Sequence, residues 1–464
     1  MAKLFAMGAY VYQAALAFGL LMVVARLLAP ADYATYSLFI ATTQVVAIAA
    51  FEWARFACSR FYPGPSAESE RDQRRTLAVE ALACTAACLL AGLAAIPFGL
   101  PPALGLVGGA VAAGQGASDL HLAVVRFARR FAAFSWLNGI RASLLAVGTL
   151  AGSLLGHTVV ATVGGLLAGY ATYGVVAWLV DRRAYPAGGV ARLAIAREHA
   201  TYGGVSAGMS VLGLLSPLGL KLILTGALGK EAAAGVLLAL DLLQRPFLMV
   251  IAALQTVEYP DVVAAFDRRA PDFAAHLGRF YALMTTLCLV SAAALYVGLR
   301  PIAEIVVAPA LRDAFLLAAP LVTLFSMLRA LTQNIATTPA HLTLNLRELA
   351  TLAVVDCLSF NLLALAASLT FPGTPLPIVA GATLGAALAG LYGLRIATSL
   401  PFITPRAPLL IGALAVLLPA IVFFAPAAPV LGFWLGGIAA GSVSLAAMLE
   451  LRIAWRRSSA TASS

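Results

Sequence analysis

The sequence predicts an all-α polytopic membrane protein of about 14 transmembrane helices, built as two pseudo-symmetric six-helix lobes plus two C-terminal helices. Three observations support this fold class. Apolar stretches long enough to cross a bilayer divide nearly the whole chain. Hydrophobic residues make up 62% of the sequence and charged residues 11%, which leaves no room for a soluble domain of ordinary composition. Lys and Arg also gather in alternate connections between the apolar stretches.

Each apolar stretch can form one membrane-spanning helix, because a hydrocarbon core about 30 Å thick needs roughly 20 apolar residues. The first stretch ends near Ala29-Pro30-Ala31, which is similar to a signal-peptide cleavage site. Only Lys3 precedes this stretch, which runs to about 22 residues, so we expect a retained helix. The predicted spans are 7–28, 35–56, 77–99, 103–125, 134–155, 158–180, 203–225, 232–256, 279–299, 314–336, 349–371, 376–398, 408–425 and 429–450.

The distribution of basic residues predicts the orientation, because Lys and Arg in short loops stay on the cytoplasmic side. With the N-terminus inside, 21 basic residues fall on the cytoplasmic side and 4 on the outer side. An even number of spans then places both termini in the cytoplasm. We expect a multi-pass protein of a bacterial inner membrane. The net charge of +10 follows from this topology and from attraction to anionic lipid, so no nucleic-acid partner is predicted.

The connections between spans argue against an enzyme. The longest outer segment, 300–313, is predicted to be a single amphipathic turn, too small for the catalytic loop of a sugar-transferring or sugar-polymerising enzyme. The larger cytoplasmic loops contain no phosphate-binding glycine loop, which argues against an ATP-driven pump. We therefore expect neither catalytic residues nor a cofactor. The short connections are 100–102, 156–157, 372–375 and 426–428, and the larger cytoplasmic loops are 57–76, 181–202 and 257–278.

The histidines and cysteines do not have the spacing of a metal or redox site. His199 and His276 fall on basic cytoplasmic loops, where solvated side chains are expected. Cys84 and Cys88 share a helical face inside an apolar span and are interpreted as small apolar packing residues. No metal ligand is predicted.

An internal repeat divides the chain. Residues 25–38 join the first two spans, and residues 224–236 join spans 7 and 8 with a similar order of helix end, small turn and new apolar helix. Gln44 and Gln244 occupy equivalent places at the same offset of 200 residues. Because six spans separate the copies, both halves enter the membrane in the same direction. The predicted domains are an N-terminal lobe 1–200, a C-terminal lobe 201–400 and an accessory part 401–464.

The same residues resemble the Wzx-like polysaccharide-biosynthesis flippases, a branch of the superfamily that includes lipid II flippases and MATE drug exporters. The resemblance rests on the run Ala-Arg-Leu-Leu-x-Pro-x-Asp-Tyr-x-x-Tyr at 25–36, its weaker copy at 226–236, and Tyr259-Pro260. Lys221 and Ala232–Ala234 depart from the polar, tyrosine-containing second copy often seen there. The resemblance implies alternating-access transport of a polyprenyl-diphosphate-linked oligosaccharide to the outer leaflet without ATP, serving polysaccharide polymerase and export machinery.

Basic residues within the spans are the predicted substrate ligands, because a cation at bilayer depth costs roughly 2.5–3.5 kcal/mol and needs a partner or a use. Lys221, beside Pro217 and Gly219, is either a diphosphate ligand or a side chain that reaches the outer interface. Arg245 follows Asp241 by four residues, so the two are predicted to neutralise each other or to exchange partners with a phosphate. The other basic residues in the spans are Arg141, Arg329 and Arg395, of which topology alone can explain Arg141 and Arg395.

Acidic residues within the spans are the predicted coupling or gating groups. Asp119 and Asp356 can carry a proton, or can pair with a neighbouring arginine. Glu52 and Arg55, three residues apart, are predicted to form a local pair that can serve as a gate. Gln333 and Asn334 are expected to join helices or to bind sugar, and the glycines of span 4 to permit close helix packing.

Three other functions remain open. A cation-coupled MATE-like drug exporter is disfavoured because residues 7–28 contain no carboxylate. A lipid II flippase is closer to the first interpretation. A membrane sugar polymerase or ligase belongs to a different class, and the lack of a large outer loop argues against it.

Overall fold

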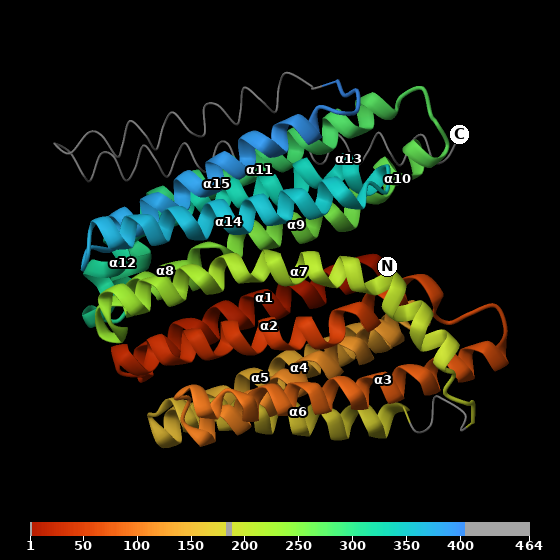
Figure 1. Cartoon of the computed structure of the whole chain (residues 1–464), viewed down its shortest axis with the longest axis horizontal. Coiled ribbons are helices and arrows are strands. Elements are labelled where there is room, and N and C mark those ends of the chain that lie inside the picture. Colours follow the sequence, from red (N-terminus) through yellow and green to blue (C-terminus); the bar gives the residue numbers. More distant parts are fainter. Residues whose placement is uncertain (1, 182–187, 404–464) are drawn as a thin grey trace. The chain divides into compact units, whose positions relative to one another are not determined.

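Long α-helices make up the computed structural model, which describes residues 2–181 and 188–403 and contains no strand within them (Figure 1). The chain divides into two compact units, Met1–Ala234 and Gly235–Ser464. The predicted division at residue 200 stays a prediction. Predicted spans 13 and 14 (408–425 and 429–450) lie outside the described residues.

Unit 1 consists of helices that pack in pairs: α5 with α6, α2 with α7, α3 with α4, and α1 with α5. Their bounds are α1 (Ala2–Leu27), α2 (Pro30–Phe61), α3 (Ala67–Ala94), the 3-10 helix η1 (Ile96–Phe98), α4 (Pro102–Phe127), α5 (Phe131–Gly156), α6 (Val159–Asp181) and α7 (Leu193–Leu228).

Unit 2 begins inside α8 and is also helical. The main packing pairs are α14 with α15, α11 with α12, and α12 with α15. The bounds are α8 (Lys230–Leu243), α9 (Arg245–Val257), α10 (Tyr259–Asp267), α11 (Phe273–Val306), α12 (Pro309–Leu331), the π-helix η2 (Thr332–Ala336), α13 (Thr337–Leu342), α14 (Leu346–Thr370) and α15 (Pro375–Ala397).

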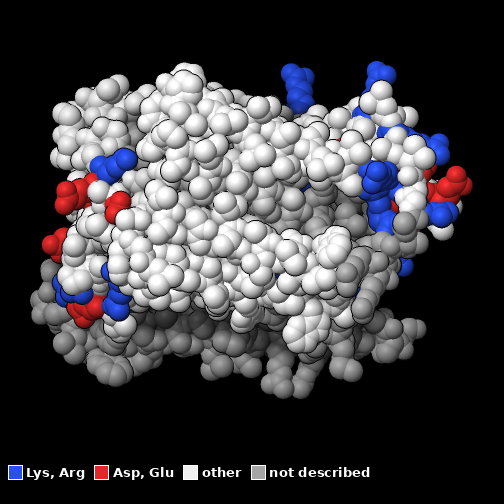
Figure 2. All heavy atoms as spheres, turned by 90° about the horizontal axis from the view of Figure 1, so that it is seen from below, with Lys and Arg blue, Asp and Glu red and all other residues white. Residues whose placement is uncertain are grey.

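Ten helical stretches among the described residues are long and apolar enough to cross a membrane. Predicted spans 1–12 each fall on described helices, which confirms a multi-pass all-α membrane protein. Most charged side chains on the face shown in Figure 2 lie towards its two ends, and most of the surface between them is uncharged. The ten stretches are Pro30–Phe61, Ala67–Phe98, Phe131–Gly156, Val159–Val180, Leu193–Leu228, Lys230–Gln255, Phe273–Val306, Pro309–Leu342, Leu346–Thr370 and Pro375–Ala397.

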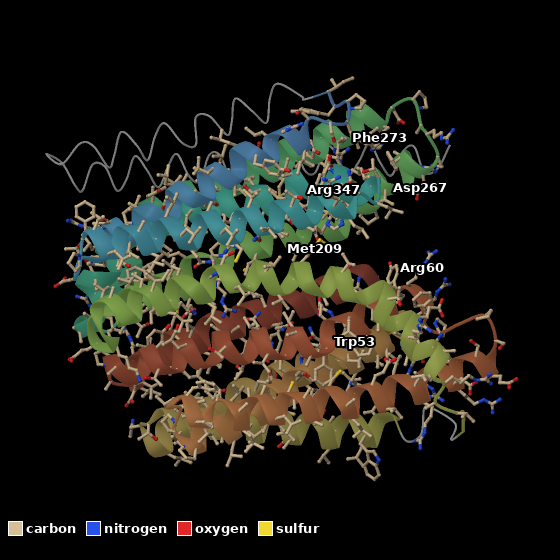
Figure 3. The ribbon with its side chains drawn as sticks, viewed as in Figure 1. Trp53, Arg60, Met209, Asp267, Phe273 and Arg347 are labelled. Atoms are coloured by element: carbon tan, nitrogen blue, oxygen red, sulfur yellow. The ribbon has the colours of Figure 1, made fainter. Side chains whose placement is uncertain are left out.

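Several helices extend beyond the predicted spans, so the connections are shorter than the sequence suggested. Hydropathy marks only the apolar part of a helix, whereas backbone hydrogen bonding continues into its polar ends. The predicted outer segment 300–313 is not a separate turn, since α11 runs to Val306 and α12 begins at Pro309. The predicted loop 257–278 contains α10, and Figure 3 labels Asp267 at its end and Phe273 at the start of α11.

Glycines bring α4 close to its neighbours, as the sequence predicted for span 4. A Cβ atom at Gly109 would meet the backbone of Cys88 on α3, and one at Gly116 would meet the ring of Phe51 on α2. In apolar surroundings, small residues permit the close backbone approach that favours helix packing. The remaining glycines of this group, Gly108 and Gly114, face Phe39 and Tyr170.

Candidate functional site

Arg141 is the centre of a buried polar network in unit 1. Its guanidinium forms an ion pair with Asp119 of α4 and donates to Ser118 Oγ at 3.1 Å. A second arm lies 3.4 Å from Asn138 Oδ1. The Arg141 side chain is 10% exposed, whereas that of Asp119 is 31% exposed. Arg141 Nε is buried and has no hydrogen-bond partner among the described residues. The cation is thus held in place with one donor unused and its counterion partly accessible.

One further hydrogen bond connects this network to α1, and a separate polar contact joins α4 to α6. Asn138 Nδ2 donates to Gln13 Oε1 of α1 at 3.0 Å. On α4, His121 Nδ1 lies 2.9 Å from the hydroxyl of Tyr173 on α6. Polar groups from α1, α4, α5 and α6 therefore meet within helices that are otherwise apolar.

Lys221 lies on the buried side of α7. Its Nζ donates to Ser37 Oγ of α2 at 3.0 Å, and its side chain belongs to the buried part of unit 1. Thr225 Oγ1 donates to the Lys221 carbonyl oxygen at 2.5 Å. Although Pro217 lies within α7, the helix runs from Leu193 to Leu228. Lys221 thus joins α2 to α7 through a hydroxyl group.

Arg329 and Asp356 form the corresponding pair in unit 2. Arg329 of α12 donates to Asp356 Oδ2 of α14 at 2.8 Å, and Gln333 Nε2 lies 3.4 Å from the same oxygen. The ring of Phe360 lies 5.0 Å from the guanidinium carbon. The side chains of Arg329 and Asp356 are 11% and 5% exposed, so both members of this pair are enclosed.

The neighbouring amides join helices. Gln255 Nε2 of α9 donates to Asn334 Oδ1 at 2.8 Å, and Asn334 Nδ2 donates to the Ala330 carbonyl at 2.8 Å. Asn334 lies in the π-helix η2, a form that is often found at functional sites. The predicted helix-joining role of Gln333 and Asn334 is consistent with these contacts.

Arg245 occupies a break in the eighth predicted span. α8 ends at Leu243 and α9 begins at Arg245, which Pro246 follows. Because proline has no N–H to donate, it favours the first turn of a new helix. Arg245 Nε lies 3.4 Å from the Asp241 carbonyl oxygen. Asp241 and Arg245 therefore lie on the same face, as predicted, and the Arg245 side chain contacts the backbone carbonyl of Asp241.

The remaining predicted residues lie nearer the helix ends. Glu52 and Arg55 form the predicted local ion pair on α2, with Arg55 44% exposed. Arg395 is exposed in the last turn of α15. Tyr259, at the start of α10, packs 5.9 Å from the ring of Phe280, and burial raises the pKa of its phenol. The described residues contain no cluster of three or more His, Cys, Asp or Glu side chains able to hold a metal ion.

His199 is the polar residue whose environment the sequence did not predict. The expectation of a solvated side chain is wrong: His199 is fully buried and contacts Glu80 and Gln73 of α3. His276 does lie on an exposed surface, 3.2 Å from Asp272. The signal in the sequence was the spacing of Gln73, Thr76, Glu80, Cys84 and Cys88, which places all five on one helical face.

The fold of this chain is that of MOP-superfamily flippases and transporters. It is similar to the inward closed structure of the lipid II flippase MurJ, with a TM-score of 0.71, 12% identity, and coverage of 95% of this chain and 98% of that one. An inward-facing MATE multidrug transporter of the MOP superfamily gives a TM-score of 0.59 and 15% identity over 84% and 96%. A MOP-superfamily transporter from Pyrococcus furiosus gives 0.52 and 13% over 85% and 94%.

At these identities the similarity concerns the fold alone. No protein-family model and no curated relative matches the sequence. The similar structures are flippases and transporters rather than enzymes.

Proposed function

We propose that this protein is a flippase for a polyprenyl-diphosphate-linked oligosaccharide, a Wzx-like function in polysaccharide export. It would move the head group from the cytoplasmic to the outer leaflet of a bacterial inner membrane by alternating access, with both termini in the cytoplasm. The fold shared with a lipid II flippase supports transport of a lipid-linked head group. The run at 25–36 supports the Wzx-like branch.

The Arg141 network is the observation that carries the proposal. A guanidinium has five N–H donors in a planar fork that matches two phosphate oxygens. In unit 1, one of these donors is buried without a partner, and the counterion Asp119 is partly exposed. A diphosphate can therefore take the place of the Asp119 carboxylate on Arg141 without leaving the cation unpaired. When the substrate binds, the partly exposed Asp119 carboxylate would turn away from Arg141 towards solvent.

Lys221 provides a second cation in the same unit. Lys221 Nζ donates to Ser37 Oγ within an apolar helix, where an ammonium costs roughly 2.5–3.5 kcal/mol. A phosphate that reaches this ammonium would accept a charge-assisted hydrogen bond from it. Arg329 and Arg245 are the proposed cations of unit 2, with Asp241, Asp356, Glu52 and Arg55 as coupling or gating groups.

Reconstitution tests the function directly. Sealed vesicles containing the full-length protein and a short-chain polyprenyl-diphosphate oligosaccharide are treated with an external sugar-cleaving enzyme. We expect protein-dependent growth of the cleaved fraction, and its loss in Lys221→Ala and Arg245→Ala. Lys230→Ala is the matched control, because Lys230 is exposed at the start of α8.

The same vesicles tested with other substrates distinguish the proposed flippase from a lipid II flippase and from a MATE-like exporter. Preferential flipping of a lipid II analogue would assign the protein to the lipid II branch instead. Export of an organic cation under an ion gradient, without flipping of either lipid, would replace the proposal by a MATE-like exporter.

A further inference from the structure

A buried imidazole–carboxylate pair lies between α3 and α7, away from the Arg141 and Lys221 contacts. His199 Nδ1 is 2.9 Å and 3.1 Å from the two carboxylate oxygens of Glu80. On the opposite side of the ring, His199 Nε2 is 2.9 Å from Gln73 Oε1. All three side chains are buried. Both ring nitrogens are therefore in hydrogen-bond contact inside unit 1.

The arrangement of acceptors fits a ring that carries two protons. A carboxylate and an amide oxygen only accept hydrogen bonds, so each ring nitrogen donates one and the imidazolium is balanced by Glu80. If the Gln73 amide turns by about 180°, its NH₂ group donates to Nε2, and the ring is then neutral. His199 Nε2 and the Gln73 amide can therefore form a hydrogen bond whether or not Nε2 carries a proton.

Histidine distinguishes this pair from the other buried carboxylates of the described chain. Glu52, Asp72 and Asp356 pair with arginines, which stay charged throughout the physiological range. An imidazole gains and loses its proton between about pH 5 and about pH 8. The Glu80–His199 pair is thus suited to exchange a proton where an arginine pair is not.

The groups packed around the ring come from α2, α3 and α7. Phe61 of α2 stacks on His199 at 5.8 Å, and Tyr202 of α7 packs against Phe61 at 5.4 Å. The thiols of Cys58 and Cys84 lie close enough to Glu80 for electrostatic interaction. Figure 3 labels Trp53 and Arg60, which come before and after Cys58 along α2. Glu80 is the acidic group that contacts the ring.

Polar contacts on either side of this cluster fix the start of α7. Asp72 Oδ1 accepts from the Val190 N–H at 2.8 Å, and Thr76 Oγ1 accepts from the Arg192 N–H at 3.1 Å. One turn beyond His199, Gly203 packs against the backbone of Trp53. A change in charge at His199 therefore acts where α3 and α2 both hold α7.

We propose that His199, Glu80 and Gln73 form a proton-binding site that controls the attachment of α7 to α3. Proton loss leaves the Glu80 carboxylate buried without a cationic partner in the cluster, which weakens the attachment, and proton binding restores the pair. Use of this site to couple transport to a proton gradient rests on the proposed function above.

The site is tested first without any substrate. Full-length protein labelled with ¹⁵N-histidine is titrated by NMR between about pH 5 and about pH 8, and His199→Gln assigns the signal. We expect the His199 ring to pass from doubly to singly protonated, with a changed midpoint in Gln73→Met. His276→Gln is the matched control, because it removes an exposed imidazole–carboxylate pair. A His199 ring that keeps one protonation state over this range overturns the proposal.

The link to transport is tested in vesicles of the same protein. Flipping of the polyprenyl-diphosphate oligosaccharide should respond to an imposed pH gradient in the wild type and in His276→Gln. The response should be lost in Glu80→Gln and His199→Gln. An unchanged response in both overturns the coupling role. Absence of flipping by the wild type would instead contradict the proposed function, while the NMR titration would still decide the proton site.

Discussion

The arginine–aspartate pairs of the two units differ in how far they are enclosed. In unit 2, Arg329 and Asp356 are both nearly inaccessible, with Gln333 beside the carboxylate and the Phe360 ring against the guanidinium. In unit 1, Arg141 is equally buried, but the side chain of Asp119 is 31% exposed. The Arg329–Asp356 pair must open before either member can meet a substrate or exchange a proton, whereas Asp119 is already accessible and can be replaced on Arg141 by an incoming anion.

From this difference we infer that an ion pair within an apolar helix bundle can have two uses. Where both charges are enclosed, removal of one partner leaves the other uncompensated, and the pair stabilises the fold by default. Where one charge remains accessible, an incoming anion can replace it.

The largest effect on stability is expected for Arg329→Met. The variant leaves the Asp356 carboxylate buried without its cation, which costs about 3–5 kcal/mol. Thermal denaturation of the purified protein in detergent measures the loss. The double variant Arg329→Met with Asp356→Leu should recover most of it, because neither charge is then buried. A double variant as unstable as the single one would show that the enclosed pair is not the cause.

A smaller effect on stability, but a clear loss of transport, is expected for Arg141→Gln. Charge-assisted hydrogen bonds contribute about 1.5–3 kcal/mol, so flipping should fall at least about tenfold. The vesicle assay measures this, with Arg126→Gln on the exposed side of α4 as the matched control. Normal flipping by Arg141→Gln would exclude the guanidinium as the diphosphate ligand.

The smallest effect is expected for Arg55→Gln. Arg55 is 44% exposed, so water already screens its interaction with Glu52, and such pairs contribute about 0.2–1 kcal/mol. Thermal denaturation should therefore show a small shift relative to Arg329→Met. A loss as large as that of Arg329→Met would place Glu52–Arg55 with the enclosed pair rather than with solvent-screened ones.

Much of the fold follows from the sequence, because the bilayer sets one length scale for every spanning helix. Predicted spans 1–12 fall on described helices for this reason. The break between α8 and α9 was not predicted, although Pro246 marks it in the sequence. Hydropathy averages over a window and does not register a single residue whose missing N–H ends one helix and begins another.

The polar contacts were predictable only in part. Local spacing was enough for Glu52 and Arg55, since residues three apart are neighbours on a helix. From the sequence, Asp119 and Asp356 could either carry a proton or pair with a neighbouring arginine. The arginines that they contact lie 22 and 27 residues away in the chain, so helix packing rather than local spacing selects them. His199 shows the same limit more strongly, because its partner Glu80 is 119 residues away.

In the π-helix η2, the number of residues affects the helix contacts as much as their identity does. A π-turn contains one residue more than the α-helical turn it replaces, so Thr332–Ala336 marks the place of a single extra residue. Without that residue, α12 would continue into α13 as one regular helix, and every later position would rotate by about 100°. Asn334 would then turn away from Gln255 although both amino acids were kept. In a related sequence, the loss of one residue at this point would change which polar side chains face the neighbouring helices, as several substitutions would.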